Sequence, residues 1–216
     1  MGRSGGCAVT DPSVKGLLLG GVVANLCRLE ERGAVSEDAL EARLGPRALE
    51  LLREKVDPAC WYPVDCYREL VDALWELEGQ RQPDYMREKG RAWARKLYDA
   101  QRYQQLEYAD SRTREIGSGD EAVRQGRLIA SLIQTFWNFV EPKVDLDPEQ
   151  PNTLRLTLEG SLASLFPEAN RYTTEGFLNH MVERGGGKHR ATSERPSPER
   201  IVFRLPLHLA KRSSKA

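Results

Sequence analysis

The stretch Thr153-Leu154-Arg155-Leu156-Thr157-Leu158-Glu159 decides the fold class. Its leucines alternate with polar residues, which is typical of a β-strand that buries one face. Upstream of this stretch, apolar residues recur at three- and four-residue steps, which indicates amphipathic helices. The periodicity changes from helical to alternating after Glu141-Pro142. Because a run of helices precedes a run of strands, the sequence predicts an α+β fold.

The residues after this strand complete a small sheet. A helix is expected from about residue 167 to Arg184, where Gly185-Gly186-Gly187 ends it. Two final strands, around residues 188–194 and 200–207, flank the turn-forming Pro196-Ser197-Pro198. A first strand is expected within residues 138–145. The prediction is therefore an N-terminal helical layer packed on a small C-terminal antiparallel sheet with ββαββ order.

Length and composition suit an ordinary globular protein, since 40% of the 216 residues are hydrophobic and 30% are charged. We expect a disordered leader over residues 1–12, a single α+β domain over residues 13–208 and a disordered basic tail over residues 209–216. Helices are predicted at residues 14–31, 36–43, 47–55, 63–78, from 83 towards 110, and 120–140.

The charge of the whole chain is balanced, with 32 Lys and Arg against 32 Asp and Glu. Such a chain has no global field to attract nucleic acid or a membrane, so neither is expected as a partner. The distribution is uneven, because basic residues outnumber acidic ones from Arg184 onward. We interpret this segment either as a solvated strand edge with a basic tail or as a docking surface for an acidic partner.

The four cysteines form no C-x-x-C pair, so we expect reduced thiols and a cytoplasmic protein. An apolar run from Gly16 to Cys27 has the length of a signal peptide. Its helical pattern continues through Glu30, however, and the run is too short to span a bilayer.

Motifs for catalysis are weak. Gly117-x-Gly119-x-x-Ala122 has the spacing of a dinucleotide-binding loop, but a helix rather than a strand precedes it. The three histidines (His180, His189 and His208) all lie in the C-terminal quarter, and no acid, base and nucleophile converge in the sequence. We therefore expect no enzyme, no catalytic residue, no metal site and no cofactor.

Aromatic residues supply the candidate binding site. Trp61, Tyr62, Trp93 and Trp137 lie on predicted helices or at their starts, and Arg91 is within reach if those helices pack together. One interpretation is a core built around indole rings. The other is a pocket in which these five residues bind an aromatic or anionic ligand. If Trp61 belongs to the core, Trp61→Ala should cost about 3–5 kcal/mol, and far less if it lines an open pocket.

Three segments together resemble a known family. They are Val14-Lys15-Gly16, Trp61-Tyr62-Pro63 followed by Tyr67, and Glu88-Lys89-Gly90-Arg91. They resemble the opening of heme-nitric-oxide-binding-type domains and their non-heme relatives. The C-terminal half, with its strand, helix, glycine run and final hairpin, resembles 4-vinyl-reductase-type ligand-binding domains. The whole chain is also similar to a myxobacterial paralogous family whose pattern includes the Trp-Tyr-Pro segment.

The resemblance implies a fold shared with bacterial sensor modules and vesicle-tethering subunits, often dimeric. Its heme-binding members hold iron through a histidine on a helix in the middle of the domain, but this chain has no histidine before His180, so heme is not expected. We predict a non-catalytic bacterial signalling or regulatory module that docks a protein partner, with a homodimer as one form of assembly. The alternative is a small-molecule sensor domain that binds its ligand between helices and sheet.

Overall fold

The computed structural model describes residues 11–100, 118–184 and 190–207. The expected leader up to residue 10 and the expected basic tail lie outside the described residues. The chain's contacts form two compact units, which are described separately. Unit 1 holds the chain up to Gln82 together with Thr135–Phe139, and unit 2 holds Pro83–Gln134 and the chain from Val140 onward. The single domain expected over residues 13–208 stays a prediction.

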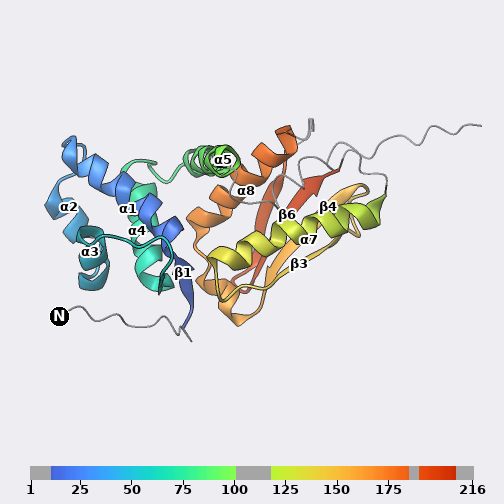
Figure 1. Ribbon diagram of the computed structural model, residues 1–216, viewed down its shortest axis with the longest axis horizontal. Helices are drawn as coiled ribbons and strands as arrows, with labels where there is room; N and C mark the ends of the chain where they lie inside the picture. Colours follow the sequence, from blue (N-terminus) through green and yellow to red (C-terminus); the bar gives the residue numbers. More distant parts are fainter. Residues whose placement is uncertain (1–10, 101–117, 185–189, 208–216) are drawn as a thin grey trace, which may run out of the picture. The chain divides into compact units, whose positions relative to one another are not determined.

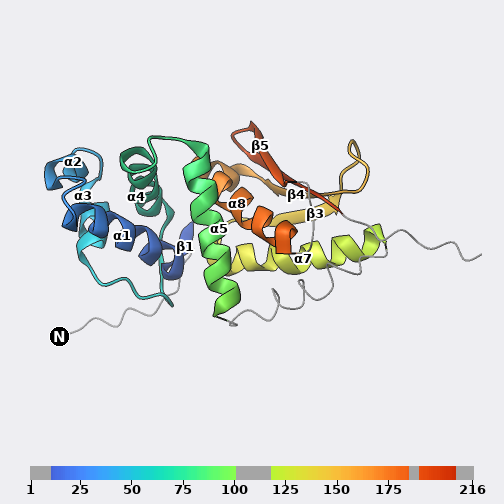
Figure 2. The same cartoon turned by 90° about the horizontal axis from the view of Figure 1, so that it is seen from above.

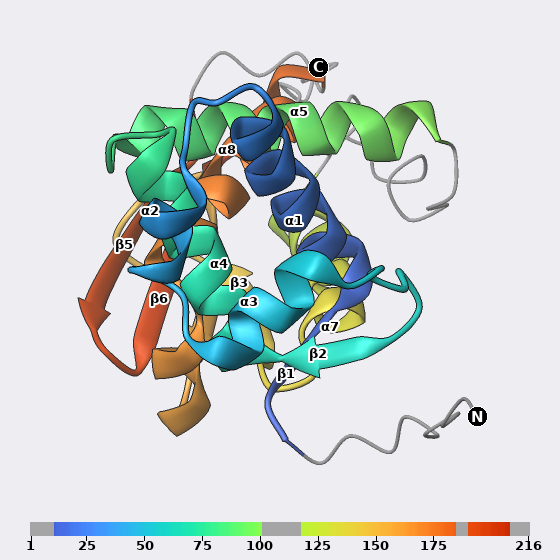
Figure 3. The same ribbon diagram turned by 90° about the vertical axis from the view of Figure 1, so that its left-hand side faces the viewer.

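Unit 1 is mostly helical and carries one short two-stranded ribbon (Figure 3). Its elements are β1 (Ser13–Lys15), α1 (Gly16–Glu31), α2 (Glu37–Glu41), α3 (Pro46–Arg53), β2 (Trp61–Pro63) and α4 (Val64–Leu77). In the ribbon β1 and β2 are antiparallel, with Val14 opposite Tyr62. A further bridge joins Val14 to Trp137, which brings the residues after α7 into this unit.

The start of α1 differs from the helix expected from Val14, because residues 13–15 form a strand. The backbone nitrogen of Gly16 donates to the carbonyl of Cys60 at 2.8 Å. A Cβ at Gly16 would lie 2.0 Å from the carbonyl oxygen of Asp57, so only glycine fits at this junction. The same pairing makes Trp61-Tyr62-Pro63 a strand, whereas the sequence analysis placed it at a helix start.

The core of unit 1 forms where α1, α3 and α4 pack together. The helix predicted at residues 63–78 is confirmed as α4, and one side of it is buried through Val64, Tyr67, Val71 and Leu74. Ser36, where the sequence predicts a helix to begin, caps α2, because its hydroxyl accepts a hydrogen bond from the backbone nitrogen of Ala39.

Unit 2 contains the sheet (Figure 1). Its elements are α5 (Pro83–Asp99), α7 (Gly119–Phe136, which ends in unit 1), β3 (Pro142–Leu146), β4 (Thr153–Glu159), the 3-10 helix η1 (Ser161–Leu165), α8 (Glu168–Arg184), β5 (Thr192–Ser197) and β6 (Arg200–Pro206). The strands lie in the order β3-β4-β6-β5, and every pair is antiparallel. The predicted α+β class and the ββαββ order are confirmed.

One face of the sheet is apolar and covered by helices. Leu156 of β4 lies opposite Phe203 of β6, and both are buried. Helix α7 comes so close that a Cβ at Gly126 would lie 2.5 Å from the Leu154 side chain. Helix α8 contacts β5 and β6. In Figure 2, α7 and α8 lie on the same side of the sheet, and the described residues place no helix on the other side.

Helix α5 packs directly on α8 through two glycines. A Cβ at Gly90 would lie 1.9 Å from the carbonyl oxygen of Thr173, and one at Gly176 would lie 2.0 Å from that of Arg87. Because α5 covers one side of α8 and the strands cover the other, α8 buries polar and apolar residues alike.

Strand β5 begins at Thr192 and runs to Ser197, so it starts later than expected and includes Pro196. The register shifts between Glu194 and Ser197, and such a bulge at an edge strand tolerates proline. None of the helices in the described residues combines the length and apolar character needed to cross a membrane.

Candidate functional site

The five predicted binding residues divide between the two units. Trp61, Tyr62 and Trp137 belong to unit 1, whereas Arg91 and Trp93 lie on α5 of unit 2. The pocket that would join all five stays a prediction.

In unit 1, the two aromatic residues of β2 have different surroundings. The Tyr62 hydroxyl accepts a hydrogen bond from the backbone nitrogen of Asp57 at 2.9 Å, and its ring lies against Gly16. Tyr62 therefore holds the residue 57–62 turn in place. Trp61 is half-buried, and the Lys15 ammonium lies 4.3 Å from its ring centroid. An indole beside an ammonium group can contact both an aromatic ring and an anion.

Trp137 belongs to the core of unit 1. Only 5% of its surface is exposed, and its ring meets those of Tyr67 and Phe139 edge-on at 5.4 and 5.7 Å. Trp137 is thus packed among aromatic rings, and its part in ligand binding stays a prediction.

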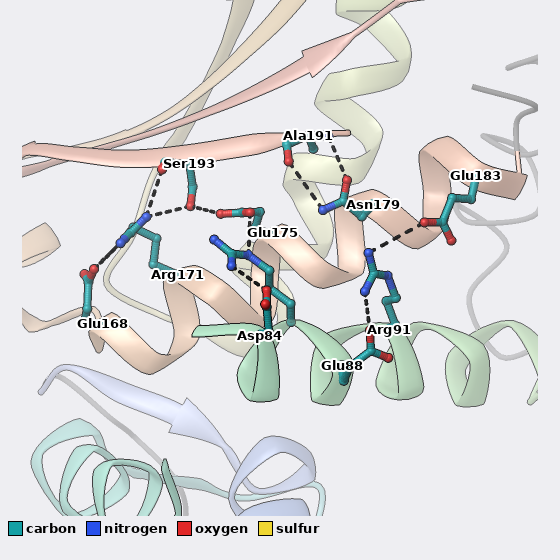
Figure 4. Close-up of polar contacts among 11 residues, drawn as sticks. Asp84, Glu88, Arg91, Glu168, Arg171, Glu175, Asn179, Glu183, Ala191 and Ser193 are labelled. Carbon is teal, nitrogen blue, oxygen red and sulfur yellow. Dashed lines mark hydrogen bonds and ion pairs between the residues drawn. The ribbon is translucent and has the colours of Figure 1, made fainter. Parts of the chain in front are cut away.

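Arg91 and Trp93 lie in the contact between α5 and α8. Arg91 pairs with Glu88 of its own helix and lies 3.7 Å from Glu183 of α8, as Figure 4 shows. The Trp93 ring packs on Phe177 with 5.3 Å between centroids. Two carboxylates thus already offset the charge that the sequence analysis assigned to ligand binding.

A network of charged and polar side chains joins α5, α8 and β5, and we call it the polar seam: Arg87, Glu168, Arg171, Glu175 and Ser193 (Figure 4). Glu175 is its centre. One carboxylate oxygen accepts from Arg87 at 2.7 Å, and the other accepts from the Ser193 hydroxyl. Only 8% of the Glu175 side chain is exposed, so the pair is largely withdrawn from water.

Arg171 continues the polar seam along α8. Its guanidinium donates to the carbonyl and the hydroxyl of Ser193 at 2.9 and 2.8 Å, and also to Glu168. Although burial alone raises the pKa of Glu168, hydrogen bonds from Arg171 and Arg195 hold that pKa below its usual value. These groups are satisfied by one another, so the arrangement fastens edge strand β5 to α8 rather than offering a free nucleophile or base.

The polar seam is absent from the predicted site residues, although the sequence carries a signal for it. Arg171, Glu175 and Asn179 recur every four residues, so they share one face of the helix expected from about residue 167 to Arg184, close to the apolar Phe177 and Met181. Asn179 acts in the same way, because its side-chain oxygen accepts from the backbone nitrogen of Ala191 at 2.7 Å. A polar stripe at helical spacing next to apolar residues indicates a buried hydrogen-bonding face as well as a solvated one.

His180 is the one histidine within residues 11–100, 118–184 and 190–207. Its ring lies 5.8 Å from the Tyr98 ring, and its Nε2 is buried without a hydrogen-bond partner. Burial lowers the pKa of His180, and the nearby cations, Arg184 first among them, lower it further despite Glu183. The imidazole is therefore neutral at pH 7.

The heme-binding domains that the sequence resembles hold iron through a histidine, but the surroundings of His180 do not suit that role. An axial ligand must present its ring nitrogen to the space where the porphyrin iron lies. Protein atoms cover the Nε2 of His180. Cys27 and Cys66 are poor replacements, because burial raises the pKa of both thiols, which disfavours the thiolate.

Comparison with known proteins gives a fold but no family. No protein-family model matches the sequence, and neither does any curated protein. Among solved structures, an unliganded iron(II) H-NOX protein mutant from K. algicida matches with a TM-score of 0.57 at 11% identity, covering 90% of this chain and 96% of that one. A mutant of T. tengcongensis H-NOX matches with a TM-score of 0.47 at 14% identity, covering 89% and 97%. On the first match, this chain has the α+β fold of H-NOX domains.

Proposed function

We propose that this chain is a non-catalytic bacterial sensor module that binds a small molecule without heme iron. The observation that carries the proposal is a fold shared with an H-NOX protein over 90% of the chain. The buried Nε2 of His180 is the reason for leaving heme iron out of it. Solved structures of the H-NOX family are described as heme proteins. The fold is thus compatible with sensing, whereas the buried Nε2 of His180, the one histidine among the described residues, argues against iron.

The ligand class follows from the chemistry at the β1–β2 ribbon. The half-buried Trp61 ring offers a stacking surface, and the Lys15 ammonium beside it offers a positive charge. An aromatic carboxylate satisfies both groups.

We also propose, on its Trp-Tyr-Pro segment, that the chain belongs with the myxobacterial paralogous family that it resembles, and we expect it to work in the cytoplasm.

Native mass spectrometry of the full chain purified from its host tests this function. We expect a retained small-molecule mass that is lost on denaturation. A smaller fraction of the Trp61→Leu protein should carry this mass. Trp75→Phe is the matched control, because Trp75 is a buried tryptophan of α4 in the same unit. Protein that carries no such mass, and whose tryptophan fluorescence does not respond to a series of aromatic carboxylates, would refute the sensing function.

Docking of a protein partner is the second candidate function. It is favoured by the sheet of unit 2, one face of which is not covered by any helix of the described residues (Figure 2). Sensor modules pass a bound-ligand signal to another protein, so the two functions are compatible.

A further inference from the structure

The sheet of unit 2 has a polar face on the side away from α7 and α8, and we call it the outer sheet face. Successive residues of a strand point to opposite faces, so the residues between the β4 leucines lie here with their β6 partners. The register places Arg155 opposite Arg204, Thr157 opposite Val202, and Glu159 opposite Arg200. Thr157 and Val202 are buried and form the middle of the face.

Most charges on the outer sheet face are already paired. Arg204 donates to Asp147 at 2.7 Å and to Glu194 at 2.6 Å. Lys143 lies 3.6 Å from Glu159. Two close carboxylates therefore compensate Arg204, whereas Lys143 forms only an exposed and weaker pair with Glu159.

Arg155 and Arg200 are the two arginines of the outer sheet face for which the described residues show no ion pair. Each is half-buried, and the Nε of each is inaccessible and without a hydrogen-bond partner. No carboxylate within residues 11–100, 118–184 and 190–207 forms an ion pair with either one. Asp145 lies opposite Arg155 in the register but does not pair with it. A partly desolvated guanidinium without a counter-charge is unfavourable, so two such groups on one face point to an anionic partner.

We propose that the outer sheet face docks an acidic segment of a partner protein, whose carboxylates pair with Arg155 and Arg200. The two arginines are four residues apart along the paired strands, which is about 13 Å at the rise of a β-strand. An extended segment with two carboxylates at that spacing reaches both arginines. This inference rests on the docking function proposed above and names its surface and the charge of its partner.

Fluorescence anisotropy of a labelled decaglutamate peptide with the full chain at low ionic strength tests the proposal. We expect Arg155→Gln and Arg200→Gln each to weaken binding about threefold, as for partly exposed ion pairs. Asp145→Asn should tighten binding, because it removes the one unpaired carboxylate of the face. Arg124→Gln is the control, since Arg124 is an exposed cation on α7, and it should leave the affinity unchanged.

The variants should melt no lower than the parent chain, because each removes an uncompensated charge; a lower melting temperature would mean that the arginine is structural and would count against the proposal. An unchanged affinity in the Arg155→Gln/Arg200→Gln double variant would overturn it. So would a loss seen only with Lys211→Gln/Arg212→Gln/Lys215→Gln, which assigns the peptide to the basic end of the chain. If decaglutamate fails to bind while the chain purified from its host retains a protein partner, the docking function stands and this surface is wrong.

Discussion

Single residues of the same type differ in what surrounds them, and the tryptophans of unit 1 illustrate this. By sequence alone, Trp61 and Trp137 are equivalent candidates for the core or for a pocket. In the structure Trp137 meets two aromatic rings and is almost wholly buried, whereas Trp61 is half-buried beside Lys15. Sequence pattern locates aromatic residues near the core, but the fraction of each ring that reaches water depends on which distant element packs against it.

Trp137→Ala should therefore lower the free energy of unfolding by about 3–5 kcal/mol. Trp61→Ala should cost less than half as much, because part of that ring is already in water. Urea denaturation of both variants gives the two values. If Trp61→Ala proves the more destabilising, then the burial assigned to β2 is wrong.

His180 should make stability depend on pH. Its pKa lies below 6.5 in the folded chain, first because of burial and then because of Arg184, so the unfolded chain binds the proton more readily. The stability contributed by the neutral imidazole is complete above pH about 6.5 and is lost as the pH falls towards the folded pKa. Urea denaturation between pH about 7.5 and 5 should show this slope, and His180→Phe should remove it. An equal slope in both proteins would place the titrating group elsewhere.

At the scale of elements, some contacts depend on residues whose role cannot be recognised from the periodicity of their own segment. The sequence predicted α1, α4, α5 and α8 because each has an apolar pattern of its own. It did not predict the β1–β2 ribbon, since three-residue strands are stabilised only by pairing across about fifty residues of chain. It also missed the polar seam, because a carboxylate such as Glu175 is ordinarily a surface residue.

The contact between α5 and α8 should be sensitive to a single methyl group. Gly90→Ala places a Cβ against the backbone of Thr173, which cannot move aside as a side chain could, so we expect a loss of about 3 kcal/mol. Gly21→Ala is the matched control, because no atom outside its own helix lies within 4 Å of the added Cβ, and alanine favours a helix by up to about 1 kcal/mol. Thermal melts compare the two. Equal stability of Gly90→Ala and the parent chain would exclude the close packing.

The polar seam should be stronger than the exposed ion pairs. Glu175→Gln leaves Arg87 without its buried counter-charge, so we expect a loss of about 2–3 kcal/mol. Glu88→Gln removes an exposed carboxylate from Arg91 and should cost below about 1 kcal/mol. Chemical denaturation measures both, and similar losses for the two variants would show that Glu175 is not buried as described.

For the whole molecule, the order of helices and strands identified the α+β class, and short motifs identified the fold shared with H-NOX domains. The sequence could not assign the candidate site to one place, because Trp61 and Tyr62 lie in one compact unit and Arg91 and Trp93 in the other. Charge balance over the whole chain also concealed the outer sheet face, since Arg155 and Arg200 become distinctive only after their neighbours have paired with each other.

Titration of the full chain with hemin, followed by its visible absorption, tests the central claim that this fold functions here without heme iron. We expect no stoichiometric complex and the same weak absorption change in the parent chain and in His180→Ala. A one-to-one complex with a sharp Soret band that His180→Ala abolishes would contradict the account, because it would show that the buried Nε2 opens to hold iron.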